Sequence, residues 1–232
     1  MDQTVEYLDT YHGRYQVIRF CEHLARFLSG CCAKQISGKL LTFSDQLGSC
    51  RVVLRLFDDL SMLRYNLLYG FGKEDIPDIK IRILTVFSNI CDQLYYPLEH
   101  LAWAEDIGLL TPRKNINYWT ASSILWALSS YFSMSRSLSQ AKSLHAQKST
   151  FKLYGSEITR KSPRYKEYVK LSNLQFLAII SALQNLADLI RAIHYFPNGF
   201  LWAGRLKEWQ IGAFGVVSCL LSFYEHHASM VK

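Results

Sequence analysis

Proline and glycine are scarce in this chain. Only five of the 232 residues are proline and twelve are glycine, and these are the residues that most often end or kink helices. Charged residues make up only 19% of the chain, whereas half of all residues are hydrophobic. This balance excludes an intrinsically disordered chain. The scarcity of helix-breaking residues favours long helices, and we expect an all-α fold.

The cysteines lack any framework that would bind a metal. None of the six forms a Cys-x-x-Cys pair, and no histidine lies at zinc-finger spacing, so we expect no metal site. Scattered cysteines without a disulfide pattern are typical of a reducing compartment. Residues Met1–Tyr11 are acidic and have no apolar core, so we expect no signal peptide.

Motifs for catalysis are missing as well. The sequence contains no Gly-x-Ser-x-Gly, no phosphate-binding loop and no Gly-x-Gly-x-x-Gly. Three Glu-His dipeptides occur, but a helical metal site needs ligands four positions apart. Asp58 and Asp59 are adjacent on the expected helix and therefore do not face each other. We expect no catalytic residue, no cofactor and no enzymatic activity.

The net charge of +7 is concentrated in one segment. Between Arg136 and Lys170 lie nine basic residues and two acidic ones. Such a segment suits anionic lipid head groups, nucleic acid or a solvated linker. The rest of the chain has no nucleic-acid recognition motif, so we expect no nucleic-acid partner.

The clearest helical pattern covers Leu40–Tyr69. At 100° per residue, Arg51 and Arg55 fall on a polar side, and a set of large apolar residues falls opposite. That apolar set is Val53, Leu56, Phe57, Leu60, Leu63 and Leu67. Such a helix can lie in a membrane interface with its apolar side inserted and its arginines among the phosphates. The same pattern also suits a bundle helix with a core face.

Two uncharged segments are candidate membrane spans, residues 115–135 and 209–225. The first is long enough to cross the bilayer core, and the second is short for a span. Each carries a stripe of small residues, which let helices approach closely. The stripes are Ser122, Ser129 and Ser133 in the first segment, and Gly212, Gly215, Cys219 and Ser222 in the second. The two helices could pack on each other or on another copy, and a buried helix in a soluble protein remains the alternative.

One motif occurs twice, at Asn89–Asp106 and Asn185–Arg205. Both copies open Asn-apolar-x-Asp, pass through apolar and aromatic residues to a proline, and end at a Trp-Ala pair. Each is followed by an uncharged segment that begins around a tryptophan. The chain therefore reads as two versions of one helical unit, although two similar helix ends could also arise by chance.

Four strings identify a family. They are CRVVLRLFDDLSML (Cys50–Leu63), DQLYYPLEHLAWA (Asp92–Ala104), WTASSILWALS (Trp119–Ser129) and NLADLIRAIHYFPNGFLWAGR (Asn185–Arg205). In this order they resemble the peroxisomal membrane protein 11 (peroxin-11) family, and within it the gamma or C type. The resemblance covers nearly the whole chain.

The resemblance implies a multi-pass protein of the peroxisomal membrane that elongates the membrane before peroxisome fission. It also implies an amphipathic helix that generates curvature, with Arg51 and Arg55 contacting anionic phospholipid. The implied partners are further copies of the chain, paralogues of the family and the peroxisome fission machinery. Both termini are expected in the cytosol. That topology places the basic connector in the lumen, opposite to the positive-inside rule.

These expectations divide the chain into six parts. They are a cytosol-facing amphipathic helical region (1–114), a membrane segment (115–135), the basic connector (136–170), a helix with a Pro-Asn-Gly break (171–208), a second membrane segment (209–225) and a short tail (226–232). Two other functions remain open, an oligomeric pore lined by the serine stripe and a soluble helical adaptor.

Overall fold

The computed structural model describes residues 2–70, 72, 78–111, 116–153 and 163–230. Within these ranges all regular secondary structure is helical, which confirms the predicted all-α fold. The elements are α1 (Asp2–Asp9), α2 (Tyr11–Leu28), α3 (Lys34–Leu54), the 3₁₀ turn η1 (Arg55–Phe57), α4 (Asp58–Tyr69), α5 (Ile79–Asp106), α6 (Tyr118–Leu153), α7 (Pro163–His194) and α8 (Glu208–Met230).

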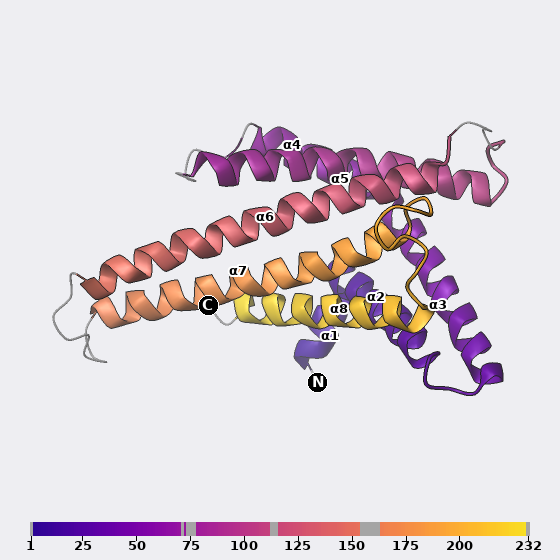
Figure 1. Ribbon diagram of the computed structural model, residues 1–232, viewed down its shortest axis with the longest axis horizontal. Helices are drawn as coiled ribbons and strands as arrows, with labels where there is room; N and C mark the ends of the chain where they lie inside the picture. The colour runs from indigo at the N-terminus through magenta and orange to yellow at the C-terminus, as the bar shows by residue number, and fades with distance from the viewer. Residues whose placement is uncertain (1, 71, 73–77, 112–115, 154–162, 231–232) are drawn as a thin grey trace.

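The long helices lie side by side in chain order (Figure 1). Helix α5 packs on α6, α6 on α7, and α7 on α8, so that consecutive helices are spatial neighbours. Helix α2 packs on α8 and on α3, and α4 lies against α5. This order brings α2 and α3, from the beginning of the chain, against helices from its second half.

Local sequence explains several helix ends. The Thr10 side chain caps α2, since its Oγ1 accepts a hydrogen bond from the Gly13 amide at 2.9 Å. Asp78 caps α5 in the same way, accepting from the Lys80 amide. Pro97 lies inside α5, which continues to Asp106. A proline can kink or stop a helix at the residue before it, here Tyr96, but α5 does not stop there.

The repeated motif takes two different forms. The first copy stays helical through Pro97, whereas in the second copy α7 ends at His194 and Pro197 lies in the following loop. Trp202 in that loop donates from Nε1 to the Ile190 carbonyl at 2.9 Å. This bond holds the loop against the last turns of α7.

The predicted helix over Leu40–Tyr69 is divided in two. Helix α3 begins earlier, at Lys34, and the 3₁₀ turn at Arg55–Phe57 separates it from α4. Residues of α3 and α4 therefore do not lie on one continuous helical surface.

Small residues make close helix contacts possible. A core cluster contains Ala127, Ala192 and Ile193, with Trp126 and Trp202 packed against it. At Gly212 the helices α8 and α2 approach so closely that an added Cβ would lie 2.3 Å from the Phe27 amide nitrogen. Packing of this kind depends on small side chains at the contact.

Both predicted stripes of small residues serve contacts within one chain. The hydroxyl of Ser88 on α5 lies 3.1 Å from that of Ser129 and 2.8 Å from that of Ser133, so the serine stripe joins α6 to α5. Ser122 is also buried. The second stripe joins α8 to α2: Gly215 faces His23, Cys219 is fully buried, and Ser222 accepts a hydrogen bond from Gln16. Neither stripe joins α6 to α8.

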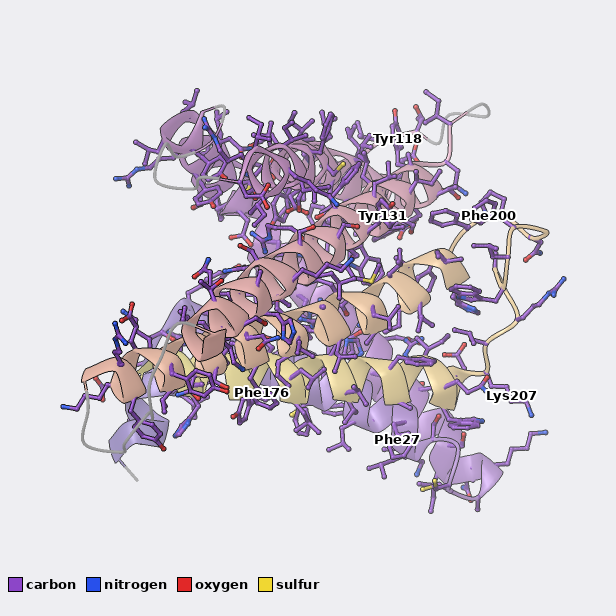
Figure 2. All side chains as sticks on the ribbon, turned by 60° about the vertical axis from the view of Figure 1, so that its left-hand side comes forward. Phe27, Tyr118, Tyr131, Phe176, Phe200 and Lys207 are labelled. Atoms are coloured by element: carbon purple, nitrogen blue, oxygen red, sulfur yellow. The ribbon has the colours of Figure 1, made fainter. Side chains whose placement is uncertain are left out.

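Large apolar side chains are abundant on the outside. Tyr131 on α6 and Phe176 on α7 are half exposed (Figure 2). Among the described residues, one helix is long and apolar enough to cross a membrane, Arg164–His194 within α7. Neither 115–135 nor 209–225 meets that criterion in the described residues, and the two spans expected there stay predictions. Serine and asparagine interrupt the first segment, and glycine and serine interrupt the second.

The basic connector is largely helical. Its first part is the distal half of α6 and its last part the beginning of α7. Residues 154–162 lie outside the described ranges.

Candidate functional site, a polar cavity between the helices

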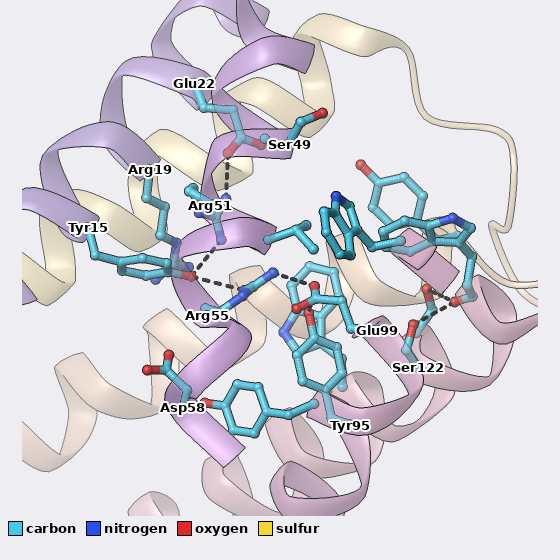
Figure 3. Close-up of a pocket in the computed structure, with 18 of the residues that line it drawn as sticks. Tyr15, Arg19, Glu22, Ser49, Arg51, Arg55, Asp58, Tyr95, Glu99 and Ser122 are labelled. Carbon is cyan, nitrogen blue, oxygen red and sulfur yellow. Dashed lines mark hydrogen bonds and ion pairs between the residues drawn. The ribbon is translucent and has the colours of Figure 1, made fainter. Parts of the chain in front are cut away.

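A cavity of about 950 Å³ lies between the amino-terminal helices and the long helices (Figure 3). Its lining comes from α2, α3, η1, the first residue of α4, α5, α6 and α7, together with residues of the joint before α6. Polar and aromatic side chains dominate this lining, and five arginines and seven carboxylates belong to it. We refer to it as the polar cavity.

Helical spacing explains why these residues converge. On α2, Tyr15, Arg19, Glu22 and Arg26 recur at intervals of three or four positions and so share one side of the helix. Arg51 and Arg55 stand four positions apart on the facing helix. When α3 packs on α2, the two polar sides meet and form one wall of the polar cavity.

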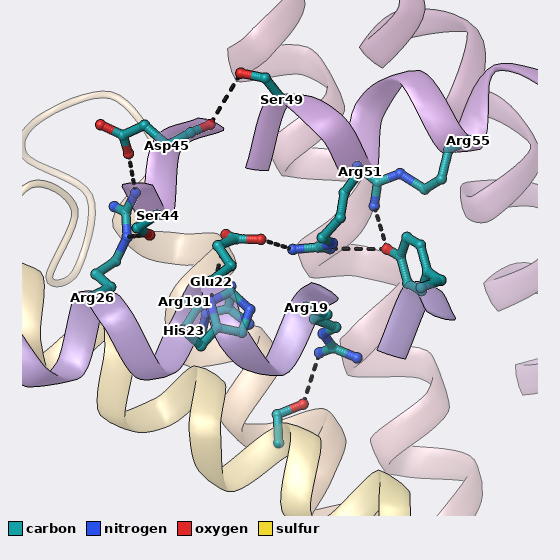
Figure 4. A network of polar contacts seen from close by, with 12 residues as sticks. Arg19, Glu22, His23, Arg26, Ser44, Asp45, Ser49, Arg51, Arg55 and Arg191 are labelled. Atoms are coloured by element: carbon teal, nitrogen blue, oxygen red, sulfur yellow. Dashed lines mark hydrogen bonds and ion pairs between the residues drawn. The ribbon is translucent and has the colours of Figure 1, made fainter. Parts of the chain in front are cut away.

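Tyr15 is the centre of the contact between these helices (Figure 3). Its hydroxyl accepts hydrogen bonds from Arg51 Nη2 and Arg55 Nη1, each at 2.9 Å. Arg51 also pairs with Glu22 of α2 (Figure 4), and Arg55 pairs with Glu99 of α5. The hydroxyl of Tyr95 donates to Glu99 as well. One network thus connects α2, α3, η1 and α5.

A second ion-pair group lies beside the first. Arg19 donates to Asp188 at 2.8 Å and to Ser218 at 2.9 Å, and Arg191 donates to Asp188 at 3.1 Å. This group joins α2 to α7 and α8. Breaking such a buried pair by removing one partner leaves an uncompensated charge, which costs about 3–5 kcal/mol.

The charges shift the ionisation of their neighbours. Burial alone would raise the pKa of Tyr15, but the positive charges of Arg51, Arg55 and Arg19 outweigh burial and lower it. Burial lowers the pKa of His23 well below its ordinary value, and Arg191 and Arg51 add to that effect. His23 is therefore neutral at physiological pH and packs as a core side chain.

The structure places Arg51 and Arg55 inside, where sequence reasoning expected an outer polar side. Their side chains are only 12% and 13% exposed, and both guanidinium groups already have carboxylate partners. Contact of their paired Nη atoms with lipid head groups at a membrane surface would require these pairs to open. The sequence could not reveal this, because Glu22 and Glu99 are far from the arginines along the chain.

The apolar residues opposite these arginines point away from the molecule. Phe57, Leu60, Leu67 and Leu68 are 79%, 70%, 76% and 75% exposed, and Leu63 is exposed as well. We call these five residues the outer apolar face. Val53 on α3 is also exposed, whereas Leu56 is half-buried. A bundle helix would have buried this side as its core face, so the alternative of an ordinary core helix is not what the structure has.

Several cavity residues were missed as functional candidates, although signals for them exist. Glu22 and Glu99 belong to Glu-His dipeptides that were considered only as metal ligands. The aspartates of the repeated motif, Asp92 and Asp188, both line the polar cavity. A charged residue within an apolar segment usually has a buried partner, and this rule points to Asp188 and Arg191.

The described part of the chain offers no group of three or more His, Cys, Asp or Glu side chains that could hold a metal ion. What the polar cavity presents is hydrogen-bonding and ionic chemistry, in which arginines and tyrosines meet carboxylates. The serines proposed to line a pore lie instead between α5 and α6, and no observation on the described residues favours a pore.

An all-α chain with ionic groups turned inward, apolar side chains turned outward and a helix long enough to span a bilayer has the organisation of a helical membrane protein. Residues 1–226 match the model of a known family, described as peroxisomal biogenesis factor 11 (PEX11), and the chain belongs to this family.

Two relatives agree with this assignment. The chain is 38% identical over 224 residues to peroxisomal membrane protein 11C of Homo sapiens, and the match covers 94% of this chain and 90% of the relative. It is 36% identical over 222 residues to peroxisomal membrane protein 11C of Mus musculus, covering 93% and 89%. A comparison with solved structures finds no match. The family resemblance expected from the four strings is thus confirmed.

Proposed function

We propose that this chain remodels the peroxisomal membrane, elongating it into tubules ahead of fission. Membership of a family of peroxisomal biogenesis factors supports the location and the general role in proliferation. The observation that carries the mechanism is the outer apolar face, where large side chains of η1 and α4 stand in the open while the polar side of α3 faces inward.

The mechanism is insertion of α4 into one leaflet. Burying a large apolar side chain releases about 1.5–3 kcal/mol, so Phe57, Leu60 and Leu67 together would supply several kcal/mol toward adsorption. A helix that lies in the interface with its apolar side down enlarges the leaflet it enters. The membrane then bends toward that leaflet, and clustered copies add their effects.

The 3₁₀ turn allows α4 to insert while the arginine network stays closed. Arg51 and Arg55 lie in α3 and η1, ahead of the outer apolar face, and their partners are Glu22 and Glu99. Contact of these two arginines with anionic phospholipid remains a prediction, and it requires the network to open. Helix α7 supplies the candidate anchor.

Association completes the proposal. We expect copies of this chain to assemble with one another and with paralogues, and the elongated membrane to recruit the fission machinery. A multi-pass arrangement with both termini in the cytosol is the topology we propose.

The test uses the purified full-length chain and liposomes of phosphatidylcholine with phosphatidylserine. Electron microscopy counts tubules for the native chain, for Leu60→Glu and for Ser61→Glu. Both positions are exposed on α4 and both variants gain the same charge, but only Leu60 belongs to the outer apolar face. We expect Leu60→Glu to abolish tubules and Ser61→Glu to keep most of them. Equal tubulation by all three proteins would refute insertion through this face.

A further inference from the structure

Membrane insertion through the outer apolar face does not use the polar cavity. A cavity of about 950 Å³ is in the size range of small-molecule sites, roughly 300–1,000 Å³. Each of its five arginines has a carboxylate partner, whereas Asp58 and Asp92 form no ion pair in the described structure. The cavity therefore has an arginine-rich part and a part with these two carboxylates, and the two parts lie next to each other.

The arginine-rich part surrounds Tyr15. Arg51 and Arg55 meet there at the same hydroxyl. Their Nε atoms are buried and have no hydrogen-bond acceptor among the described residues, and the same holds for Arg191 Nε. Buried N–H groups without acceptors are costly. An anion with several oxygen atoms would provide the missing acceptors, because guanidinium groups bind phosphate oxygens well.

The carboxylate-rich part contains Asp58 and Asp92. In the described structure neither aspartate forms an ion pair: Asp58 accepts hydrogen bonds from the Tyr11 hydroxyl at 3.1 and 3.2 Å, and Asp92 has Ser129 as its hydrogen-bond partner. Tyr96 lines the cavity together with them, and burial, then the charges of Asp92 and Asp58, raise the pKa of its hydroxyl. Carboxylates beside an aromatic ring form a setting that attracts ammonium groups.

The two parts are adjacent. Arg55 and Asp58 are three positions apart across the end of η1, and Figure 3 shows both beside Tyr15. The charge of Arg55 acts on Asp58 and on Tyr96. A ligand with one charge of each sign, a short distance apart, would therefore match the polar cavity better than an ion of a single sign.

We propose that the polar cavity binds a zwitterion in which a phosphate is joined to an ammonium group, the chemistry of phosphocholine and phosphoethanolamine. The phosphate lies at Arg51, Arg55 and Tyr15, and the ammonium group lies at Asp58, Asp92 and Tyr96. The ligand is either a free phosphomonoester or the head group of a phospholipid. A simple anion would be repelled by the aspartates and a simple cation by the arginines.

Calorimetry on the full-length chain, purified in a maltoside detergent without phosphate or choline, tests this. The probes are phosphocholine, inorganic phosphate, choline and dihexanoyl phosphatidylcholine. We expect the best zwitterion to bind on the order of tenfold more tightly than either half. Binding of phosphocholine identifies a free phosphomonoester as sufficient, and binding of the short-chain lipid alone identifies a lipid head group. The proposal is overturned if neither phosphocholine nor dihexanoyl phosphatidylcholine binds. It is also overturned if inorganic phosphate or choline binds as tightly as the better of these two zwitterions.

Three variants locate the two parts. The double variant Arg55→Gln with Glu99→Gln removes the anion contact without leaving a buried carboxylate unpaired, and we expect at least a tenfold loss of zwitterion affinity. Asp92→Asn should weaken the zwitterion severalfold and leave inorganic phosphate unaffected. Arg64→Gln, at an exposed position on α4, is the matched control and should change nothing.

Thermal denaturation shows which variants are folded. If the double variant does not fold, Asp92→Asn still tests the ammonium contact. We expect this variant to fold, because asparagine has the same shape as the unpaired aspartate that it replaces. Unchanged zwitterion affinity in folded Asp92→Asn would overturn the placement of the ammonium group.

Discussion

The segment from Arg51 to Leu68 has a buried side that is charged and an exposed side that is apolar. Its inward side carries Arg51 and Arg55, which are paired with carboxylates and surrounded by other helices. Its outward side carries the outer apolar face, with Leu67 and Leu68 among its most exposed residues. In a water-soluble helix the apolar side is the buried one. Here the charged side is buried and the apolar side is exposed. We attribute this reversal to contact of the apolar side with the membrane.

Substitutions on the two sides should have different effects on stability. A change on the inward side breaks an ion pair and leaves its partner buried without a counter-charge, so the free energy of unfolding should fall. A change on the outward side removes no contact within the chain, so the fold should persist while membrane binding is lost. The predictions below test this difference, from the largest expected effect on stability to the smallest.

Loss of one buried ionic partner should have the largest effect. Arg55→Ala leaves Glu99, which is only 3% exposed, without its cation. We expect a loss of about 3–5 kcal/mol in stability and a fall in melting temperature of about 10 °C, measured by thermal denaturation in detergent. The double replacement Arg55→Gln with Glu99→Gln should recover most of that loss. A melting temperature equal to that of Arg64→Ala would contradict the inward placement of Arg55.

The glycine contact between α8 and α2 should come next. In Gly212→Ala the new Cβ would lie 2.3 Å from a backbone nitrogen of α2, which cannot move without shifting the helix. We expect a destabilisation of about 1–3 kcal/mol. Gly38→Ala is the control, since a Cβ there meets nothing within 4 Å, and it should stabilise the chain by about 0.5–1 kcal/mol. Equal behaviour of the two variants would argue against this helix contact.

Asp92 should make stability depend on pH. Burial raises the pKa of its carboxyl to about 6, although Ser129 and Arg136 act in the opposite direction. In the unfolded chain the carboxyl ionises near its ordinary value of about 3.9. Between pH 4 and pH 7 the unfolded state therefore loses its proton first, and folding loses up to about 3 kcal/mol.

Replacing Asp92 with asparagine removes this dependence. Relative to the native chain, Asp92→Asn should be more stable by about 1–3 kcal/mol at pH 7.5 and no more stable at pH 4. Melting curves at the two pH values measure the difference. A stability gain of the same size at both values would rule out ionisation of Asp92 as the cause.

The smallest effect on stability should occur on the outward side. Leu67→Gln changes a side chain that is 76% exposed, so we expect stability in detergent to change by less than about 0.5 kcal/mol. Binding to liposomes should nevertheless fall severalfold in a flotation assay. A large loss of stability would mean that the outer apolar face is covered by protein, for instance by a second copy.

Much of the fold was predictable because helical signals are local. The spacing of apolar residues predicted helix on both sides of Leu56 but not the 3₁₀ turn in which Leu56 lies, and the motif at Asn185–Arg205 correctly marked the end of α7 near Pro197. Pro97 did not stop α5, which continues to Asp106. The sequence reading preferred charge-free stretches as spans and passed over α7, whose apolar run includes Asp188. The spans at 115–135 and 209–225 stay predictions.

The polar cavity was not predictable in the same way. Tyr15, Glu22 and Glu99 are ordinary residues on three helices, and nothing local connects them with Arg51 and Arg55. Only the packing of α2, α3 and α5 brings them together. The two stripes of small residues were predictable only in part. The sequence indicated close helix contacts there, but only the structure shows that the stripe on α6 contacts α5 and the stripe on α8 contacts α2.

The sequence by itself determined that the chain is helical, which family it belongs to, and which residues share a side of each helix. These properties depend on residues that are close together in the chain, and the spacing of apolar and polar residues therefore predicts them. The tertiary structure alone decided which side faces inward. That choice depends on ion pairs such as Arg51–Glu22 and Arg55–Glu99, which join helices far apart in the chain, and on burial of charge being tolerated only where a partner meets it.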